Sequence, residues 1–113
     1  MQTVLLIDDD PTICRSVGRL LRFMGFQVLI ASSGAEALEI AERIDGEHQI
    51  DLVLSDVQMS DMSGHEVAAA FAERYPVVLM SGALKQQVSG ILAKPFTPNE
   101  LLQHIQSALR VAA

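Results

Sequence analysis

The chain has 113 residues, half of them hydrophobic, and a formal net charge of −6. This length and composition predict one folded domain over residues 1–113. The acidic balance argues against direct binding to nucleic acid, and no apolar run approaches the ~20 residues of a membrane helix. The lone Cys14 excludes an internal disulfide. Because residues 1–7 also lack the features of a signal peptide, a cytoplasmic location is expected.

Short apolar runs alternate with helical patterns along the whole chain. The apolar runs predict strands at residues 3–7, 26–31, 51–55, 77–80 and 91–93. Capping signals and apolar periodicity predict helices beginning at Pro11, after Ser33, over residues 64–74 and after Thr97. The helical residues expected to face the core include Ile13, Val17, Leu38, Ala41, Val67, Ala70, Phe71, Leu101 and Ile105. This alternation predicts an α/β fold with a parallel sheet.

The connection between the last two predicted strands is short. Ten residues, 81–90, separate them, whereas a parallel crossover with a complete helix takes about a dozen or more. The helix in this crossover is therefore predicted to be one or two turns long or absent. Thin cover of this kind would leave part of both strands exposed, at Val78 or Met80 and at Ile91 or Ala93. We expect this face, with the last helix, to bind a second copy of the chain or an output partner.

Four of the predicted strands end on polar residues. Asp8 and Asp9 follow the first strand, Asp56 the third, Ser81 the fourth and Lys94 the fifth. In a parallel sheet these ends lie along one edge, where open α/β sheets bind ligands. Neighbouring carboxylates repel one another, and Mg²⁺, which prefers oxygen ligands, would offset that repulsion. A nucleophilic carboxylate with a lysine and a hydroxyl nearby suits phosphoryl transfer.

These segments resemble the receiver domain of two-component response regulators. The matching residues are 5–11, 55–59, 62–64, 80–82 and 93–96. The resemblance implies a flavodoxin-like, doubly wound, five-stranded parallel sheet in the order 2-1-3-4-5. It also implies that Asp56 accepts a phosphoryl group from a phosphohistidine on a histidine kinase or a histidine phosphotransfer protein.

The resemblance implies a role for each site residue. The implied Mg²⁺ ligands are Asp8, Asp9, Asp56 and the backbone carbonyl of Gln58. Ser81 resembles the switch hydroxyl, and Lys94 resembles the phosphoryl-binding lysine. In the family, the peptide bond that follows this lysine is commonly cis, and in this chain it is the bond between Lys94 and Pro95. The chain departs from the family pattern in two of its residues as well as in the short crossover: Ile91 stands in place of the switch aromatic and Ser60 in place of the usual proline.

Two other hypotheses fit parts of the sequence. Residues 8–12 also match the opening motif of haloacid-dehalogenase-type phosphatases, in which Asp8 would be the nucleophile and Asp10 the acid. That hypothesis leaves Asp56 without a role. Alternatively, the chain is an interaction module that keeps the fold and no longer switches. As a receiver it would not be an enzyme toward other substrates, but would catalyse its own phosphorylation and dephosphorylation.

Overall fold

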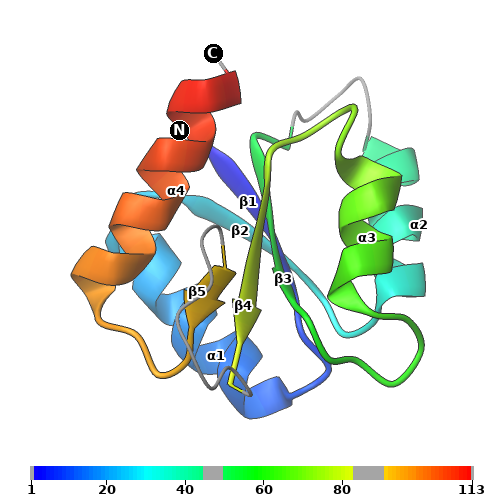
Figure 1. Ribbon diagram of the computed structural model, residues 1–113, viewed down its shortest axis with the longest axis horizontal. Coiled ribbons are helices and arrows are strands. Elements are labelled where there is room, and N and C mark those ends of the chain that lie inside the picture. The colour runs from blue at the N-terminus through cyan, green and yellow to red at the C-terminus, as the bar shows by residue number, and fades with distance from the viewer. Residues whose placement is uncertain (1, 45–49, 83–90, 113) are drawn as a thin grey trace.

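The computed structural model describes residues 2–44, 50–82 and 91–112. Its elements, in chain order, are β1 (Thr3–Ile7), α1 (Pro11–Phe23), β2 (Gln27–Ala31), α2 (Gly34–Ile44), β3 (Leu52–Asp56), α3 (Gly64–Phe71), β4 (Val77–Ser81), β5 (Ile91–Ala93) and α4 (Pro98–Ala112). All neighbouring strands are parallel and form one sheet in the order β2-β1-β3-β4-β5 (Figure 1). The predicted fold class and strand order are confirmed. No helix in the described part of the chain is long and apolar enough to cross a membrane.

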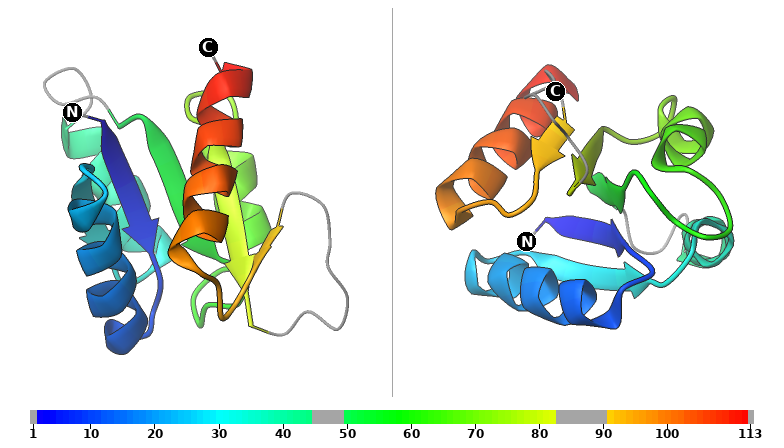
Figure 2. Two further views of the ribbon diagram at one scale, coloured as in Figure 1. Left: turned by 90° about the vertical axis from the view of Figure 1, so that its left-hand side faces the viewer. Right: turned by 60° about the horizontal axis from the view of Figure 1, so that its bottom comes forward.

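Helices cover both faces of the sheet. Figure 1 shows α1 and α4 on one side and α2 and α3 on the other, and Figure 2 shows the same elements from two further directions. Leu6 of β1 packs into the core beneath α1 and α4, whereas its neighbours Leu5 and Ile7 pack beneath α2 and α3. Successive side chains of a strand point to opposite faces. A central strand buried on both faces therefore carries apolar residues at successive positions, as residues 4–7 do in β1.

Local signals fix where the helices begin and end. At the start of α1, the Asp10 carboxylate accepts a hydrogen bond from the backbone N–H of Thr12, and Pro11 occupies the first turn. At the start of α3, Ser63 and Glu66 form a reciprocal capping box. Gly25 follows α1 with a φ of 95°, a conformation that glycine adopts without steric cost. The caps at Asp10 and Ser63 fix where the loops that carry the acids after β1 and β3 end.

For α2 and α3, the prediction of which residues face the core is partly wrong. Leu38 and Ala70 are predicted to face the core, and both are exposed. The inward residues, spaced four apart as a helix face requires, are Ala37 and Ala41 in α2 and Val67 and Phe71 in α3. Each misplaced residue lies one position, about 100° around the helix, from a residue that does face the sheet.

The face of β4 and β5 differs in detail from the expectation. Val78 and Met80 are both buried in the core beneath α1 and α4, because the pleat of β4 directs them to that side. The half-buried residues are Val77, Leu79, Ile91 and Ala93, and Leu79 pairs with Ile91 in the ladder. The short helix predicted within the crossover falls, at about residues 84–89, outside the described residues.

Candidate functional site

The polar residues that end the strands meet at one edge of the sheet. The carboxyl ends of the strands lie at the bottom of Figure 1, together with the loops that follow β1, β3 and β5. Asp8 directly follows β1, Asp56 closes β3 and Ser81 closes β4. Lys94 directly follows Ala93, which pairs with Ser81 in the ladder. The fold therefore brings these four sequence-predicted residues to the same edge.

Lys94 connects the two buried carboxylates of this edge. Its Nζ lies 3.1 Å from Oδ2 of Asp8 and 3.2 Å from Oδ1 of Asp56. Asp8 is 1% exposed and Asp56 is 8% exposed, and a charge buried to this degree is costly unless it is paired. The backbone N–H of Lys94 donates to the carbonyl of Ser81, and the Lys94–Pro95 peptide bond is cis, as the resemblance implies.

The loop after β1 is fixed by hydrogen bonds to Asp8. Oδ1 of Asp8 accepts from the backbone N–H of Asp10 at 2.9 Å, and its carbonyl accepts from Sγ of Cys14 at 3.2 Å. Burial, followed by the negative charges of Asp8 and Asp10, raises the pKa of the Cys14 thiol. The buried cysteine is therefore a neutral structural residue. Asp10 caps α1 and is not among the clustered acids.

Three carboxylates converge at this edge. Asp8, Asp9 and Asp56 each offer one oxygen, and the three oxygens lie within 4.8 Å of one another. When all three are ionised, the charge of Lys94 leaves the group with a surplus of two negative charges. A divalent cation with a preference for oxygen ligands matches both the surplus and the donor atoms. The residues present therefore fit Mg²⁺.

The environment shifts the pKa values of Asp56 and Lys94. Burial raises the pKa of Asp56; the charge of Lys94 opposes this rise and the charge of Asp8 adds to it. Burial disfavours the charge of Lys94, but hydrogen bonding and attraction to Asp8, followed by Asp56, outweigh it and raise the pKa of the lysine. The ionised Asp56 carboxylate is thus less stable here than in water, whereas the ammonium is held in its charged form.

The loop between β3 and α3 is anchored at both ends, which sequence reasoning missed. The backbone N–H of Gly64 donates to the carbonyl of Val57 at 2.7 Å, and a Cβ at Gly64 would lie 2.5 Å from the carbonyl oxygen of Asp56. Any larger residue at position 64 would therefore push α3 away from the end of β3. The available signal was a glycine at the first position of a predicted helix.

Asp61 anchors the same loop to α2. Its Oδ1 accepts from the backbone N–H of Gly34 at 3.2 Å and its Oδ2 from that of Ala35 at 3.0 Å. The bonds from Ala35 and Gly34 hold the pKa of Asp61 below its usual range. In the sequence Asp61 looks like a further member of the acidic group, but it caps a helix that begins 27 residues earlier.

The other predicted residues lie around the site. Gln58 is exposed in the loop after β3, and Ile91 is half-buried at the start of β5. Ser81 is 4% exposed. Ser81 and Gln58 therefore lie at the edge of the sheet where the acids gather, whereas Ile91 lies at the opposite, amino end of β5.

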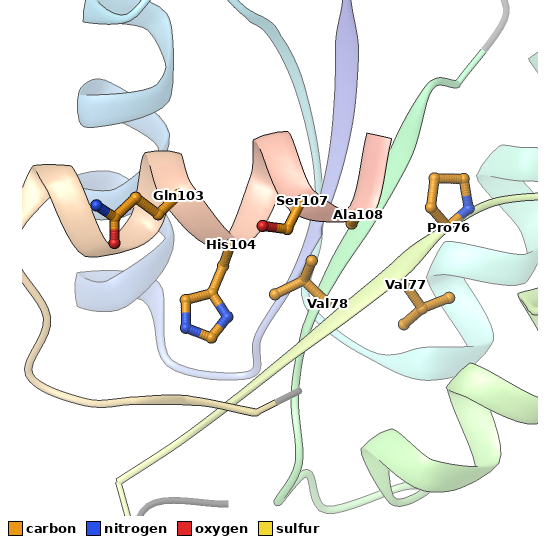
Figure 3. Close-up of a pocket in the computed structure, with 7 residues that line it drawn as sticks. All are labelled: Pro76, Val77, Val78, Gln103, His104, Ser107 and Ala108. Atoms are coloured by element: carbon orange, nitrogen blue, oxygen red, sulfur yellow. The ribbon is translucent and has the colours of Figure 1, made fainter. Parts of the chain in front are cut away.

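A cavity of about 590 Å³ lies away from this edge, between β4 and α4. Its lining residues, shown in Figure 3, are Pro76, Val77, Val78, Gln103, His104, Ser107 and Ala108. Pro76 and Val77 lie at the amino end of β4, whereas the clustered acids lie at the carboxyl ends of the strands. The lining contains no carboxylate, so this cavity is not the candidate site.

The doubly wound sheet, with three carboxylates and one lysine at its carboxyl edge, defines a class of small phosphoryl-accepting domains. The chain belongs to the response regulator receiver domain family, whose family model matches residues 4–106. Receiver domains bind Mg²⁺ at an acidic pocket and are phosphorylated by histidine kinases. They are generally not enzymes in the usual sense.

Relatives of the chain support this membership. The chain is 33% identical to the transcriptional regulatory protein GlrR of Escherichia coli and 35% identical to the transcriptional regulatory protein KdpE of Mycobacterium tuberculosis. Each alignment covers 97% of the chain, but only 27% of GlrR and 52% of KdpE. The chain thus spans between a quarter and about half of the length of these curated relatives.

Solved structures of receiver domains share the fold. A receiver domain protein from Clostridium thermocellum superposes with a TM-score of 0.83 at 28% identity, covering 99% of this chain and 97% of that one. The chemotaxis protein CheY4 of Vibrio cholerae gives a TM-score of 0.80 at 28% identity, covering 96% of this chain and 99% of that one. Both similarities extend over nearly the whole of each chain.

Proposed function

We propose that this receiver domain accepts a phosphoryl group on Asp56 from a phosphohistidine of a histidine kinase or a histidine phosphotransfer protein. The observation that carries the proposal is the contact of Lys94 with both buried carboxylates, at 3.1 Å from Asp8 and 3.2 Å from Asp56. Asp56 ends a central strand and is 8% exposed, so its carboxylate borders the surface at the edge where ligands of such sheets bind.

Mg²⁺ would be held by Asp8, Asp9, Asp56 and the backbone carbonyl of Gln58. Three of these donors are the carboxylates whose oxygens lie within 4.8 Å of one another. When bound, the ion neutralises negative charge on the carboxylates and on the phosphoryl oxygens. Asp9 is the most exposed of the three acids, and the variant Asp9→Ala is therefore expected to bind Mg²⁺ more weakly without unfolding.

The transfer itself needs a nucleophile, a leaving group and charge stabilisation. An Oδ atom of Asp56 attacks phosphorus and forms the new P–O bond, while the P–N bond of the phosphohistidine breaks and its electron pair returns to the imidazole nitrogen. Lys94 then exchanges its contact with Asp56 for a contact with a phosphoryl oxygen, and the hydroxyl of Ser81 donates to another. Attack of water on phosphorus later returns the free carboxylate and inorganic phosphate.

The output is proposed to be a change of conformation or association rather than rotation of an aromatic switch. Ile91 has no polar group that could exchange partners as a tyrosine hydroxyl does. Leu79, Ile91 and Ala93 are half-buried and form part of neither core cluster. We propose that this apolar patch binds a second copy of the chain or an output partner. The proposed location of the protein is the cytoplasm.

Membership of the receiver family sets the phosphatase hypothesis aside, and Asp10, its proposed acid, caps α1 instead. The competing hypothesis is the interaction module that does not switch. Incubation with acetyl phosphate, with and without Mg²⁺, separates these hypotheses. Mg²⁺-dependent, hydroxylamine-sensitive labelling is expected for a receiver. Rapid release of phosphate through labelled Asp8 would indicate a phosphatase, and no labelling would indicate the non-switching module.

A further inference from the structure

One contact joins the acidic group to the loop that follows the proposed phosphoacceptor. The backbone N–H of Ser60 donates to Oδ2 of Asp9 at 3.1 Å, across 51 positions of sequence. We propose that this N–H is a positioning group for Mg²⁺ binding: it holds the carboxylate of Asp9 toward Asp8 and Asp56. The inference rests on the proposed Mg²⁺ site and adds a residue that supplies no ligand atom.

Asp9 needs such a partner more than the other two acids do. Asp8 and Asp56 are buried and are held by Lys94, and Asp8 also accepts from the N–H of Asp10. Asp9 is exposed, and within the described ranges the N–H of Ser60 is the hydrogen-bond donor to its carboxylate. Metal-binding carboxylates that are hydrogen-bonded by a second layer of residues bind their ion more tightly, because their orientation is already fixed.

The donor is itself fixed by its loop. On one side of Ser60, the carbonyl of Val57 accepts from the N–H of Gly64. On the other side, Asp61 accepts from two backbone N–H groups at the start of α2. Ser60 lies between these two anchors, so its N–H is aimed at Asp9 before any ion arrives. A donor with a fixed direction costs little entropy when the ligand set assembles.

The residue type at position 60 allows the contact, because serine keeps its backbone N–H. Ser60 stands where the receiver pattern usually has proline, and proline has no backbone N–H to donate. A proline at this position would therefore leave the Asp9 carboxylate without the Ser60 hydrogen bond. The family pattern also indicates that proline is compatible with this loop, which makes Ser60→Pro a conservative way to remove one donor.

The test compares Ser60→Pro, which removes the N–H, with Ser60→Ala, which removes the hydroxyl and keeps the N–H. Affinity is measured for Mn²⁺ by electron paramagnetic resonance of the free ion and for Mg²⁺ by calorimetry, both without phosphodonor. Ser60→Pro is expected to bind each ion about 10-fold more weakly than the wild type, the lower end of the effect seen for outer hydrogen-bond partners of metal ligands. Ser60→Ala is expected to match the wild type.

Wild-type affinity in Ser60→Pro would overturn the proposal, and so would an equal loss in Ser60→Ala, because the hydroxyl would then be responsible. If the proline variant does not fold, replacing the peptide bond between Met59 and Ser60 with an ester removes the same N–H without a ring, and the same 10-fold loss is expected. Asp9→Ala is the parallel control. If it also binds both ions like the wild type, the proposed Mg²⁺ site itself fails, rather than the role of Ser60 alone.

Discussion

The ammonium of Lys94 lies 3.2 Å from Oδ1 of Asp56, although the two residues are 38 positions apart in the sequence. The same ammonium contacts Asp8, so one cation compensates two carboxylates that are almost inaccessible to water. Removal of the cation would leave two buried negative charges close together, a more costly state than the loss of one surface ion pair. Lys94 is thus placed to stabilise the free domain, in addition to its proposed role of binding the phosphoryl group.

The substitution Lys94→Met, which keeps the length of the side chain and removes its charge, is expected to lower the free energy of unfolding by about 1–3 kcal/mol. It should also slow labelling by acetyl phosphate. The measurement is urea denaturation of the metal-free protein. In the double variant with Asp56→Asn the stability loss should be smaller, because one of the two repelling carboxylates is gone. If Lys94→Met lowers the free energy of unfolding equally in the wild type and in Asp56→Asn, the interaction between Lys94 and Asp56 is contradicted.

Asp56→Asn is expected to be as stable as the wild type or more stable at pH 7. Because the folded protein raises the pKa of Asp56, the folded state binds that proton more tightly than the unfolded state does. This stabilisation is complete below the unfolded pKa of about 3.9 and is lost as the pH rises through the folded pKa. Thermal unfolding of the metal-free proteins should show a difference in midpoint that grows above about pH 4 in favour of asparagine. A variant less stable than the wild type at pH 7 would contradict this account.

Asp61→Asn is expected to lower the thermal midpoint at neutral pH, because a neutral amide oxygen accepts the α2 N–H groups less strongly than a carboxylate. The folded protein lowers the pKa of Asp61, so its contribution is present above the unfolded pKa, about 3.9, and is lost as the pH falls through the folded value. The midpoints of the variant and the wild type should therefore converge in acid. The control is Glu39→Gln, an exposed acid in the middle of the same helix. An equal shift in this control would argue against a specific cap.

The apolar patch of Leu79, Ile91 and Ala93 predicts association. The mass in solution, measured by light scattering with and without beryllofluoride and Mg²⁺, is expected to increase in the phosphoryl-mimicking state. Ile91→Glu should abolish that increase, since it places a charge in a surface that must become dry. Phe23→Glu, on an 89% exposed residue at the end of α1, serves as the matched control. A monomer in every state, together with unchanged partner binding in Ile91→Glu, would contradict the role of this patch.

The sequence predicts the central features of the fold because these features are local. The apolar runs that end on Asp8, Asp56, Ser81 and Lys94 indicate both the strands and their common edge, and the structure brings those residues together. The fold could be predicted well since every strand of a parallel sheet contributes its carboxyl end to the same side.

What the sequence did not reveal depends on contacts between distant segments. The cap that Asp61 provides for α2 and the N–H of Ser60 at Asp9 join residues 26 to 51 positions apart, and nothing in either segment alone indicates its partner. The exposure of Leu38 is a smaller failure of the same kind. Packing against the sheet decides which of two adjacent helix residues faces inward, and in α2 that residue is Ala37.

The position of the phosphoryl group after reaction with acetyl phosphate and Mg²⁺ identifies the phosphoacceptor directly. Reduction with borohydride converts an aspartyl phosphate to homoserine, which peptide mass spectrometry then assigns to one position. We expect homoserine at position 56 in the wild type and no homoserine in Asp56→Asn, with Asp10→Asn as a control that is labelled like the wild type. Homoserine at position 8, or undiminished labelling of Asp56→Asn, would contradict the assignment of Asp56 as the phosphoacceptor.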